Sequence, residues 1–394
     1  MWMRLSVAVG LLAVAAGCAL SHERDGARPH DGGAEICEPH FGEPVFLDGT
    51  DEDWTVIALA EGPSGELWLI LTAPNATFSL DWWLMRIDGS VTTLIAPAEF
   101  DCEQLFHGVA LVFSPEGPIA IWRGPPGCLT ASDYASSLLG SLAFGWDGNA
   151  RAPSTRLRNG GFGGHAGAVW LGGRVVASAP STGGWCSACY IELDSRGQPL
   201  EGFTDVDMAG YPAPPVRELP LRFEPGSPPS LAVREDELIG MAEGPSGELV
   251  FFEADTRLTM SDHQVLEGSE GHSGIGRPTV DSSGTAAVTW SVFVTRRDQV
   301  SYLALIETDG ATTVRTTREQ ISGLQWIGER FAAFRDRGRG RRATREVVLM
   351  TQALDVLHVM ALPDETRFGL ATTDGRLFLI GDEPRPWIAT AECL

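Results

Sequence analysis

The sequence predicts an all-β protein, specifically a seven-bladed β-propeller. The octet AEGPSGEL occurs twice, at residues 60–67 and 242–249, which start 182 positions apart. Each copy consists of apolar residues, a glycine turn and an alternating strand, the order expected of a β-hairpin. Weaker copies of this pattern recur along the chain, which is the second observation behind the prediction.

The weaker copies lie at residues 111–122, 168–178, 279–290, 324–334 and 370–380. The predicted turn glycines of the seven copies are Gly65, Gly117, Gly173, Gly247, Gly284, Gly328 and Gly375. A second hairpin with Asp-Gly or a related turn follows most of them, so each unit has four strands. Four strands in every 40 to 50 or so residues are typical of a propeller blade. Six or eight blades remain alternatives if one weak copy is miscounted.

The spacing of the two octets fits four blades, so we expect them to form equivalent turns in blades one and four. The last unit is one strand short, and residues 44–49 (PVFLDG) are predicted to supply the missing strand and close the ring. Residues 345–362 are interpreted as two strands around Ala353–Asp355, with a helix as the alternative.

Two segments depart from the repeat. Residues 204–236 are rich in proline and are predicted to be an insertion outside the blades. Residues 334–346 (FRDRGRGRRATRE) form a basic loop on an otherwise acidic chain. This loop is expected either to bind an anionic partner or to be a solvated hairpin tip.

The N-terminus has the features of an export signal. Arg4 precedes a short apolar run, and Ala15, Ala16 and Gly17 precede Cys18. This pattern resembles the bacterial lipoprotein box, which implies a signal peptide at 1–17, lipidation of Cys18 and anchoring in the cell envelope, periplasmic or at the outer-membrane surface. An ordinary secretory signal is the alternative. Residues 18–36 are predicted to be a flexible polar tether and 37–394 the propeller.

Six further cysteines are predicted to form disulfides, as expected of an exported protein. Of the fifteen pairings that six cysteines allow, we favour Cys37 with Cys393, Cys102 with Cys128, and Cys186 with Cys189. The last pair lies in GWCSACY, which resembles the thioredoxin motif. That motif opens a helix in thioredoxins, whereas a strand pattern follows here, so a structural disulfide is predicted rather than a redox centre.

Composition limits the chemistry. All 29 basic residues are arginine, which excludes P-loop, pyridoxal-phosphate and serine–lysine mechanisms. The net charge of −23 makes nucleic acid an unfavourable partner. No catalytic residues are predicted, because GHSGIG at 271–276 is one residue short of a nucleophile elbow. No cofactor is predicted either, although Asp48, Asp51 and Asp53 are a candidate calcium site.

The segments GELWLI at 65–70 and DGRLFLI at 374–380 resemble turns of extracytoplasmic sensor and NHL-type propellers. The resemblance implies a fold and leaves function open. We therefore expect a lipid-anchored propeller that binds a protein, glycan or small ligand without catalysis, and that contacts the membrane through its lipid. The alternative is a propeller hydrolase or lyase with carboxylates around the central channel.

Overall fold

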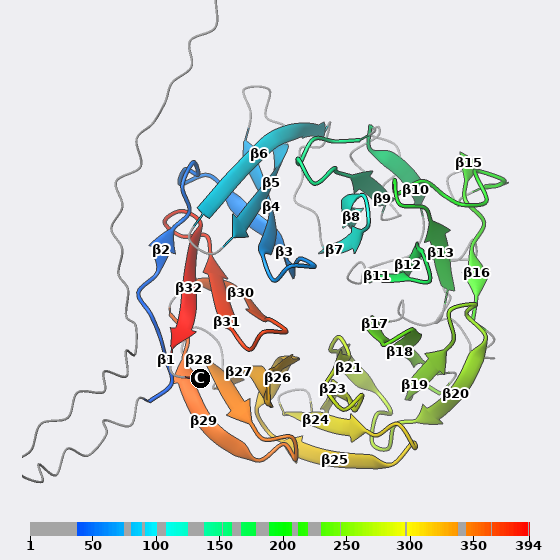
Figure 1. The fold of residues 1–394 in the computed structure, drawn as a ribbon. Coiled ribbons are helices and arrows are strands. Elements are labelled where there is room, and N and C mark those ends of the chain that lie inside the picture. Colours follow the sequence, from blue (N-terminus) through cyan, green and yellow to red (C-terminus); the bar gives the residue numbers. More distant parts are fainter. Residues whose placement is uncertain are drawn as a thin grey trace, which may run out of the picture. The chain divides into compact units, whose positions relative to one another are not determined.

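The computed structural model describes residues 38–394, except 75–79, 89–90, 101–107, 125–137, 152, 160–166, 179–188, 207–211, 220–229, 245, 296–297, 338–343, 364 and 393. All regular secondary structure in these described residues is β-strand. Seven sheets of four or five strands stand in a ring around a central opening (Figure 1), which confirms the seven-bladed propeller.

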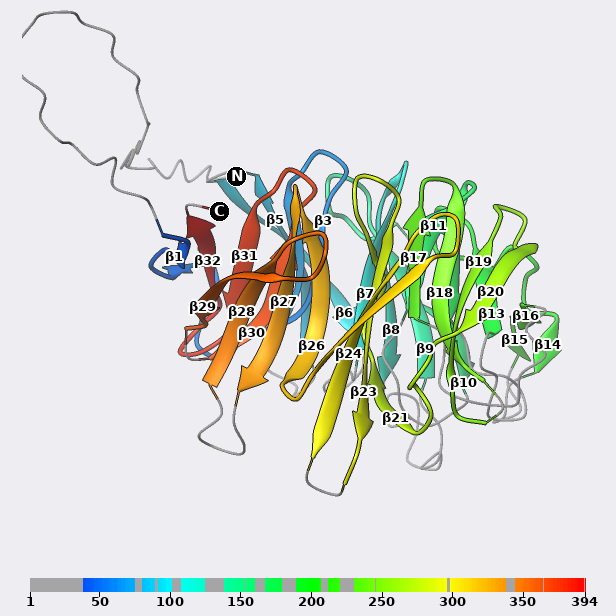
Figure 2. The same cartoon turned by 90° about the horizontal axis from the view of Figure 1, so that it is seen from below.

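Within each blade the strands run antiparallel and step outward from the centre (Figures 1 and 2). Blade one contains β3 (Thr55–Glu61), β4 (Leu67–Pro74), β5 (Leu80–Asp88) and β6 (Val91–Phe100). Blade two contains β7 (Gly108–Ser114), β8 (Gly117–Gly124), β9 (Leu138–Ala143) and β10 (Thr155–Asn159). Blade three contains β11 (Ala168–Leu171), β12 (Arg174–Ser178), β13 (Cys189–Leu193) and β16 (Arg217–Glu218).

The other four blades repeat this plan. Blade four contains β17 (Ser230–Arg234), β18 (Glu237–Glu243), β19 (Leu249–Ala254) and β20 (Met260–Val265). Blade five contains β21 (His272–Ile275), β22 (Thr279–Val280), β23 (Ala286–Phe293), β24 (Gln299–Ile306) and β25 (Thr312–Thr317). Blade six contains β26 (Gln320–Ile327), β27 (Arg330–Arg337), β28 (Thr344–Met350) and β29 (Val356–Ala361). Blade seven contains β30 (Thr366–Ala371), β31 (Leu377–Gly381) and β32 (Trp387–Glu392).

Hydrophobic packing between blades holds the ring together. In the described part of the chain, the buried apolar side chains form seven clusters, one at each junction between neighbouring blades. Between blades one and two, for example, Trp68 and Trp82 are fully buried and Trp122 packs edge-on against Trp82 at 5.4 Å. A single blade has two apolar faces, so only a closed ring buries both faces of every blade.

The ring closes where the sequence predicts. β1 (His40–Phe41) and β2 (Val45–Phe46) both pair antiparallel with β32, the last strand of the chain. β2 falls within the predicted segment 44–49. These N-terminal residues cover the edge that β32 would otherwise leave unpaired.

The prediction that the two octets occupy equivalent turns is wrong. Residues 60–67 connect β3 to β4, the first hairpin of blade one, whereas 242–249 connect β18 to β19, the second hairpin of blade four. First and second hairpins lie at opposite ends of the strands, and therefore on opposite faces of the ring. The turns themselves are alike: the N–H of Gly65 donates to Gly62 and that of Gly247 to Gly244, both at 3.1 Å.

The first hairpin of blade four has no glycine at its turn. β17 and β18 are joined by Glu235 and Asp236, and Glu235 has a φ of 53°. A non-glycine residue rarely adopts this left-handed conformation. This missing glycine also explains why the predicted gap from Gly173 to Gly247 is long and the next gap, to Gly284, is short.

Two other predictions have different outcomes. Residues 345–362 are two strands, as predicted, because β28 and β29 flank a turn in which Leu354 has a φ of 63°. The proposal that 204–236 lies wholly outside the blades is wrong. Its middle part supplies β16 of blade three and its end supplies β17 of blade four. Among its described residues, β14 (Asp205–Val206) and β15 (Pro212–Ala213) form a hairpin separate from the blades.

Candidate functional site at the central channel

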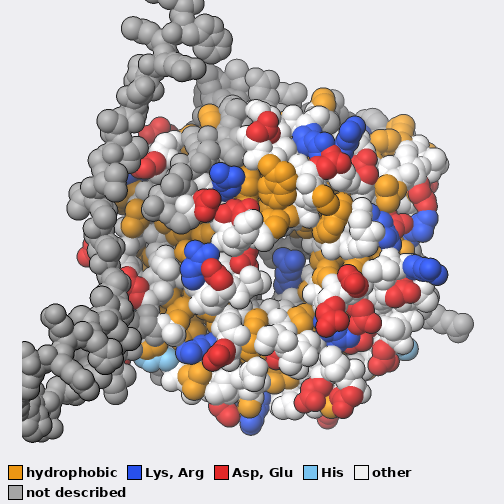
Figure 3. Space-filling model, in the orientation of Figure 1, with side chains coloured by type: hydrophobic (Ala, Val, Ile, Leu, Met, Phe, Trp, Pro, Cys, Tyr) orange, Lys and Arg blue, Asp and Glu red, His pale blue; other side chains and the backbone are white. Residues whose placement is uncertain are grey.

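The innermost strands of the blades border the central opening: β3, β7, β11, β17, β21 with β22, β26 and β30. Half-buried apolar side chains are frequent on them, including Trp170, Val233 and Val280. Figure 3 shows hydrophobic side chains around the opening and basic side-chain atoms inside it. The channel wall is therefore largely apolar with a local positive charge.

These innermost strands, as far as the structure describes them, contain one carboxylate, Glu61. Glu61 lies at the end of β3, where its Oε2 accepts a hydrogen bond from the backbone N–H of Thr373 at 2.8 Å. It is thus engaged in a contact between two turns. No pair of carboxylates from these described strands converges on the channel.

Arg277 is an arginine between the innermost strands of blade five. It lies between β21 and β22 in blade five, and its Nε donates a hydrogen bond to the carbonyl of Leu231 in β17 at 3.2 Å. The side chain is exposed to solvent, yet burial lowers the pKa of its guanidinium. A side chain that water reaches, but that protein surrounds on most sides, fits the wall of a channel.

Arg234, in the neighbouring blade, shows how the fold treats an ordinary buried arginine. Its Nη2 lies 2.8 Å from both Glu237 and Glu253. Burial alone would lower the pKa of Arg234, but the hydrogen bonds to Glu237 and Glu253 raise it above the usual value. Arg277 has no such carboxylate among the described residues.

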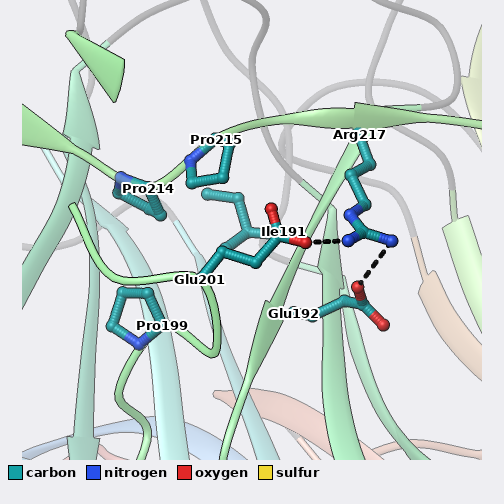
Figure 4. Close-up of a pocket in the computed structure, with 7 residues that line it drawn as sticks. All are labelled: Ile191, Glu192, Pro199, Glu201, Pro214, Pro215 and Arg217. Carbon is teal, nitrogen blue, oxygen red and sulfur yellow. Dashed lines mark ion pairs between the residues drawn. The ribbon is translucent and has the colours of Figure 1, made fainter. Parts of the chain in front are cut away.

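A small hollow outside the channel lies between β13, the turn after it and β16 (Figure 4). It is lined by Ile191, Glu192, Pro199, Glu201, Pro214, Pro215 and Arg217. Arg217 is 3.4 Å from Glu192 and also contacts Glu201, so the charges of the hollow are already paired. The hollow therefore has fewer unpaired charged groups to bind a charged ligand than the channel has.

Most of the cysteines singled out in the sequence lie outside the described residues: Cys18, Cys37, Cys102, Cys128, Cys186 and Cys393. Cys189 is described. It is buried at the start of β13, so the predicted strand after the thioredoxin-like motif is confirmed and no helix follows it. The pairing of Cys189 with Cys186 stays a prediction, as do the other two pairings.

The candidate calcium site is not assembled. Asp48, Asp51 and Asp53 are all exposed, and the described part of the chain contains no group of three or more His, Cys, Asp or Glu side chains suited to a metal ion. The backbone carbonyl of Asp51 instead accepts a hydrogen bond from Trp54 N at 3.1 Å. This segment has the geometry of a solvated acidic turn.

The basic loop is partly used by the fold itself. Its tip, 338–343, lies outside the described residues, but Arg335 on β27 is 2.7 Å from Glu346 and also pairs with Glu319. No helix in the described part of the chain has the length and hydrophobicity that a membrane span requires.

Arg277 was not identified from the sequence. The repeat copy recognised there begins at residue 279, two positions later, and GHSGIG drew attention to a serine instead. The available signal was a charged residue two positions before the inner strand β22. Sequence alone does not reveal that β17 of the next blade lies beside it.

No protein-family profile matches the chain, and no curated protein matches it in sequence. Solved structures do match its fold. A catalytically inactive virginiamycin B lyase from Staphylococcus aureus, solved with quinupristin, has a TM-score of 0.52 and 12% identity, covering 90% of this chain and 100% of that one. A streptogramin B lyase has the same TM-score and identity, covering 90% and 97%. Similarity at this level of identity establishes the propeller fold alone.

Proposed function

We propose that this chain is a non-enzymatic binding protein of the bacterial cell envelope. In this proposal lipid on Cys18 anchors it, residues 18–36 form the tether, and the propeller binds a protein, glycan or small ligand at its central channel. The supporting observation is the set of innermost strands: half-buried apolar side chains are frequent on them, Arg277 lies between two of them, and their described residues include a single, already bonded carboxylate. A concave, mostly apolar site with a few polar groups suits ligand binding.

The hydrolase or lyase alternative has less support. Hydrolysis or elimination needs an acid or base within reach of the substrate, and such groups usually occur as interacting titratable pairs. Among the described inner strands, Glu61 bonds to Thr373 at the ring surface, and Nδ1 of His272 on β21 lies 3.1 Å from the carbonyl oxygen of Gly247. The two lyases share the fold with this chain at 12% identity, and their activity is a property of those proteins.

The binding proposal is tested by blocking the channel. Gly274 is an exposed residue of the innermost strand β21, and a Cβ placed there meets nothing within 4 Å. Gly274→Trp therefore adds bulk in open space, and Thr313→Trp on the exposed outer strand β25 is the matched control. The lipid-free chain, residues 37–394, is incubated with solubilised native envelope, and bound molecules are identified by mass spectrometry.

We expect the wild type and Thr313→Trp to retain the same molecule and Gly274→Trp to lose it. Equal retention by all three proteins would place binding away from the channel, and no retained molecule would contradict the proposal. Anchoring is tested separately: Cys18→Ala should release the protein from the membrane fraction, and mass spectrometry should find lipid on Cys18 of the wild type. Peptide mapping without reduction tests the three disulfides.

A further inference from the structure

Arg277 has hydrogen-bonding capacity that the described fold does not use. A guanidinium carries five N–H donors, and one of them, Nε–H, bonds to Leu231 O at 3.2 Å. The terminal nitrogens have no carboxylate partner among the described residues. By contrast, Arg158 and Arg335, whose side chains are 0% and 12% exposed, both form ion pairs with acidic side chains.

An unpaired charge that protein surrounds is costly, because part of its hydration is lost without an opposite charge to replace it. Burial lowers the pKa of Arg277 in this way. Arginine nevertheless remains charged at neutral pH, since the guanidinium is far too strong a base to lose its proton there. A bound anion would compensate this cost.

We propose that Arg277 is the anion-binding residue of the channel and that it receives a ligand with one carboxylate on an apolar body. This inference rests on the proposed function and names its ligand class. The planar guanidinium presents two parallel N–H groups that match the two oxygens of a carboxylate. The apolar body would lie against the inner-strand side chains near Arg277, such as Ile275 and Val280, which are half-buried.

The overall charge favours a ligand with a single negative charge. The chain carries a net charge of −23, so a polyanion is repelled over most of the surface. A ligand with one carboxylate has little long-range repulsion to overcome and gains both the contact with Arg277 and burial of its apolar part.

The test uses benzoate as the probe, with benzamide as its neutral analogue and inorganic phosphate as a second anion. Calorimetric titrations at low ionic strength compare the wild-type chain, Arg277→Gln and Arg257→Gln. Arg257 is an exposed arginine in the turn between β19 and β20, so its replacement makes the same charge change away from the channel.

We expect benzoate to bind the wild type and Arg257→Gln alike. Arg277→Gln should bind it about tenfold more weakly or worse, the ratio expected for loss of one charge-assisted contact. Benzamide should bind no better to the wild type than to Arg277→Gln, and phosphate, which has no apolar body, should bind the wild type more weakly than benzoate does. Thermal unfolding of Arg277→Gln should remain cooperative, which shows that a loss of benzoate binding is not a loss of the fold.

Three results would overturn the inference: benzoate binding unaffected by Arg277→Gln, benzamide binding equal to that of benzoate, or no benzoate binding to the wild type. If the wild type ignores benzoate but still retains a molecule that Gly274→Trp loses, the anion inference fails and the binding function stands. If neither is observed, both fail.

Discussion

Glu61 in blade one and Thr373 in blade seven are hydrogen-bonded although 312 residues separate them. The Glu61 carboxylate accepts from the backbone N–H of Thr373 at 2.8 Å and from its hydroxyl at 2.9 Å. Beside this contact, Nη2 of Arg376 donates to Gly65 O at 2.7 Å. The first and last blades are therefore joined by polar contacts between turns as well as by the strand pairing of β1 and β2 with β32.

We predict that strand pairing contributes more to ring closure than the Glu61 contact. Glu61→Ala removes exposed hydrogen bonds and should lower the free energy of unfolding by about 1 kcal/mol or less. Deletion of residues 38–46 removes β1 and β2 and leaves one side of β32 unpaired. This deletion should lower the free energy of unfolding by on the order of 3 kcal/mol, since each lost hydrogen bond contributes roughly 1 kcal/mol. Urea unfolding of both variants measures these two losses of stability. Equal losses would contradict the prediction.

Arg158 should anchor the segment that precedes β16. It is fully buried and donates to Pro214 O at 2.7 Å and to the Asp205 carboxylate at 2.9 Å. Arg158→Met leaves both acceptors without this donor and should lower the free energy of unfolding by about 2–3 kcal/mol. Arg217→Met, which removes a half-exposed arginine from β16 itself, should lower the free energy of unfolding by less than about 1 kcal/mol. Chemical denaturation compares the two, with limited proteolysis reporting whether the segment has come loose.

The pair between Arg158 and Asp205 should make stability depend on pH at the acid end. The pKa of Asp205 is lowered first by the hydrogen bond from the Val206 backbone and then by the one from Arg158. A carboxyl with a lower pKa in the folded state contributes its full stability above its unfolded pKa, about 3.9, and loses it as pH falls through the folded value. The stability difference between wild type and Asp205→Asn should therefore be constant near neutral pH and shrink below about pH 4. A difference that persisted at pH 2 would show that the carboxylate charge is not its source.

The turn of blade four offers a test of backbone strain. Glu235 adopts a φ of 53°, a conformation that glycine adopts at little cost. Glu235→Gly should be neutral or stabilise the protein by up to about 1 kcal/mol. Gly65→Ala at the equivalent hairpin of blade one, where φ is 81°, should destabilise it by about 1 kcal/mol or more. Thermal unfolding of the two variants checks these opposite signs, and a loss of stability in Glu235→Gly would refute the argument.

The repeat in the sequence was sufficient for the fold, and even for the strand that closes it. Turn glycines and alternating strands are local features, because the backbone conformation of each hairpin depends on a few neighbouring residues. Residues 44–49 could be assigned to the last blade for the same reason, since one unit was visibly a strand short. The segment 345–362 shows where such patterns are weakest. Its valines favour a strand, whereas its Leu, Met, Ala and Gln residues favour a helix, and pairing with β27 decides for strands.

Tertiary structure alone decided which hairpin each turn belongs to and which side chains meet in the channel. The same octet serves two different turns because a tight turn is set by its own residues, while its position in a blade depends on the strands that pair on either side. Arg277 and Leu231 come from different blades, and nothing local to either indicates that contact. The sequence by itself determined the hairpins, because the interactions that stabilise a hairpin are local. The closed ring determined the candidate site, because closing seven blades brings distant inner strands together around one opening.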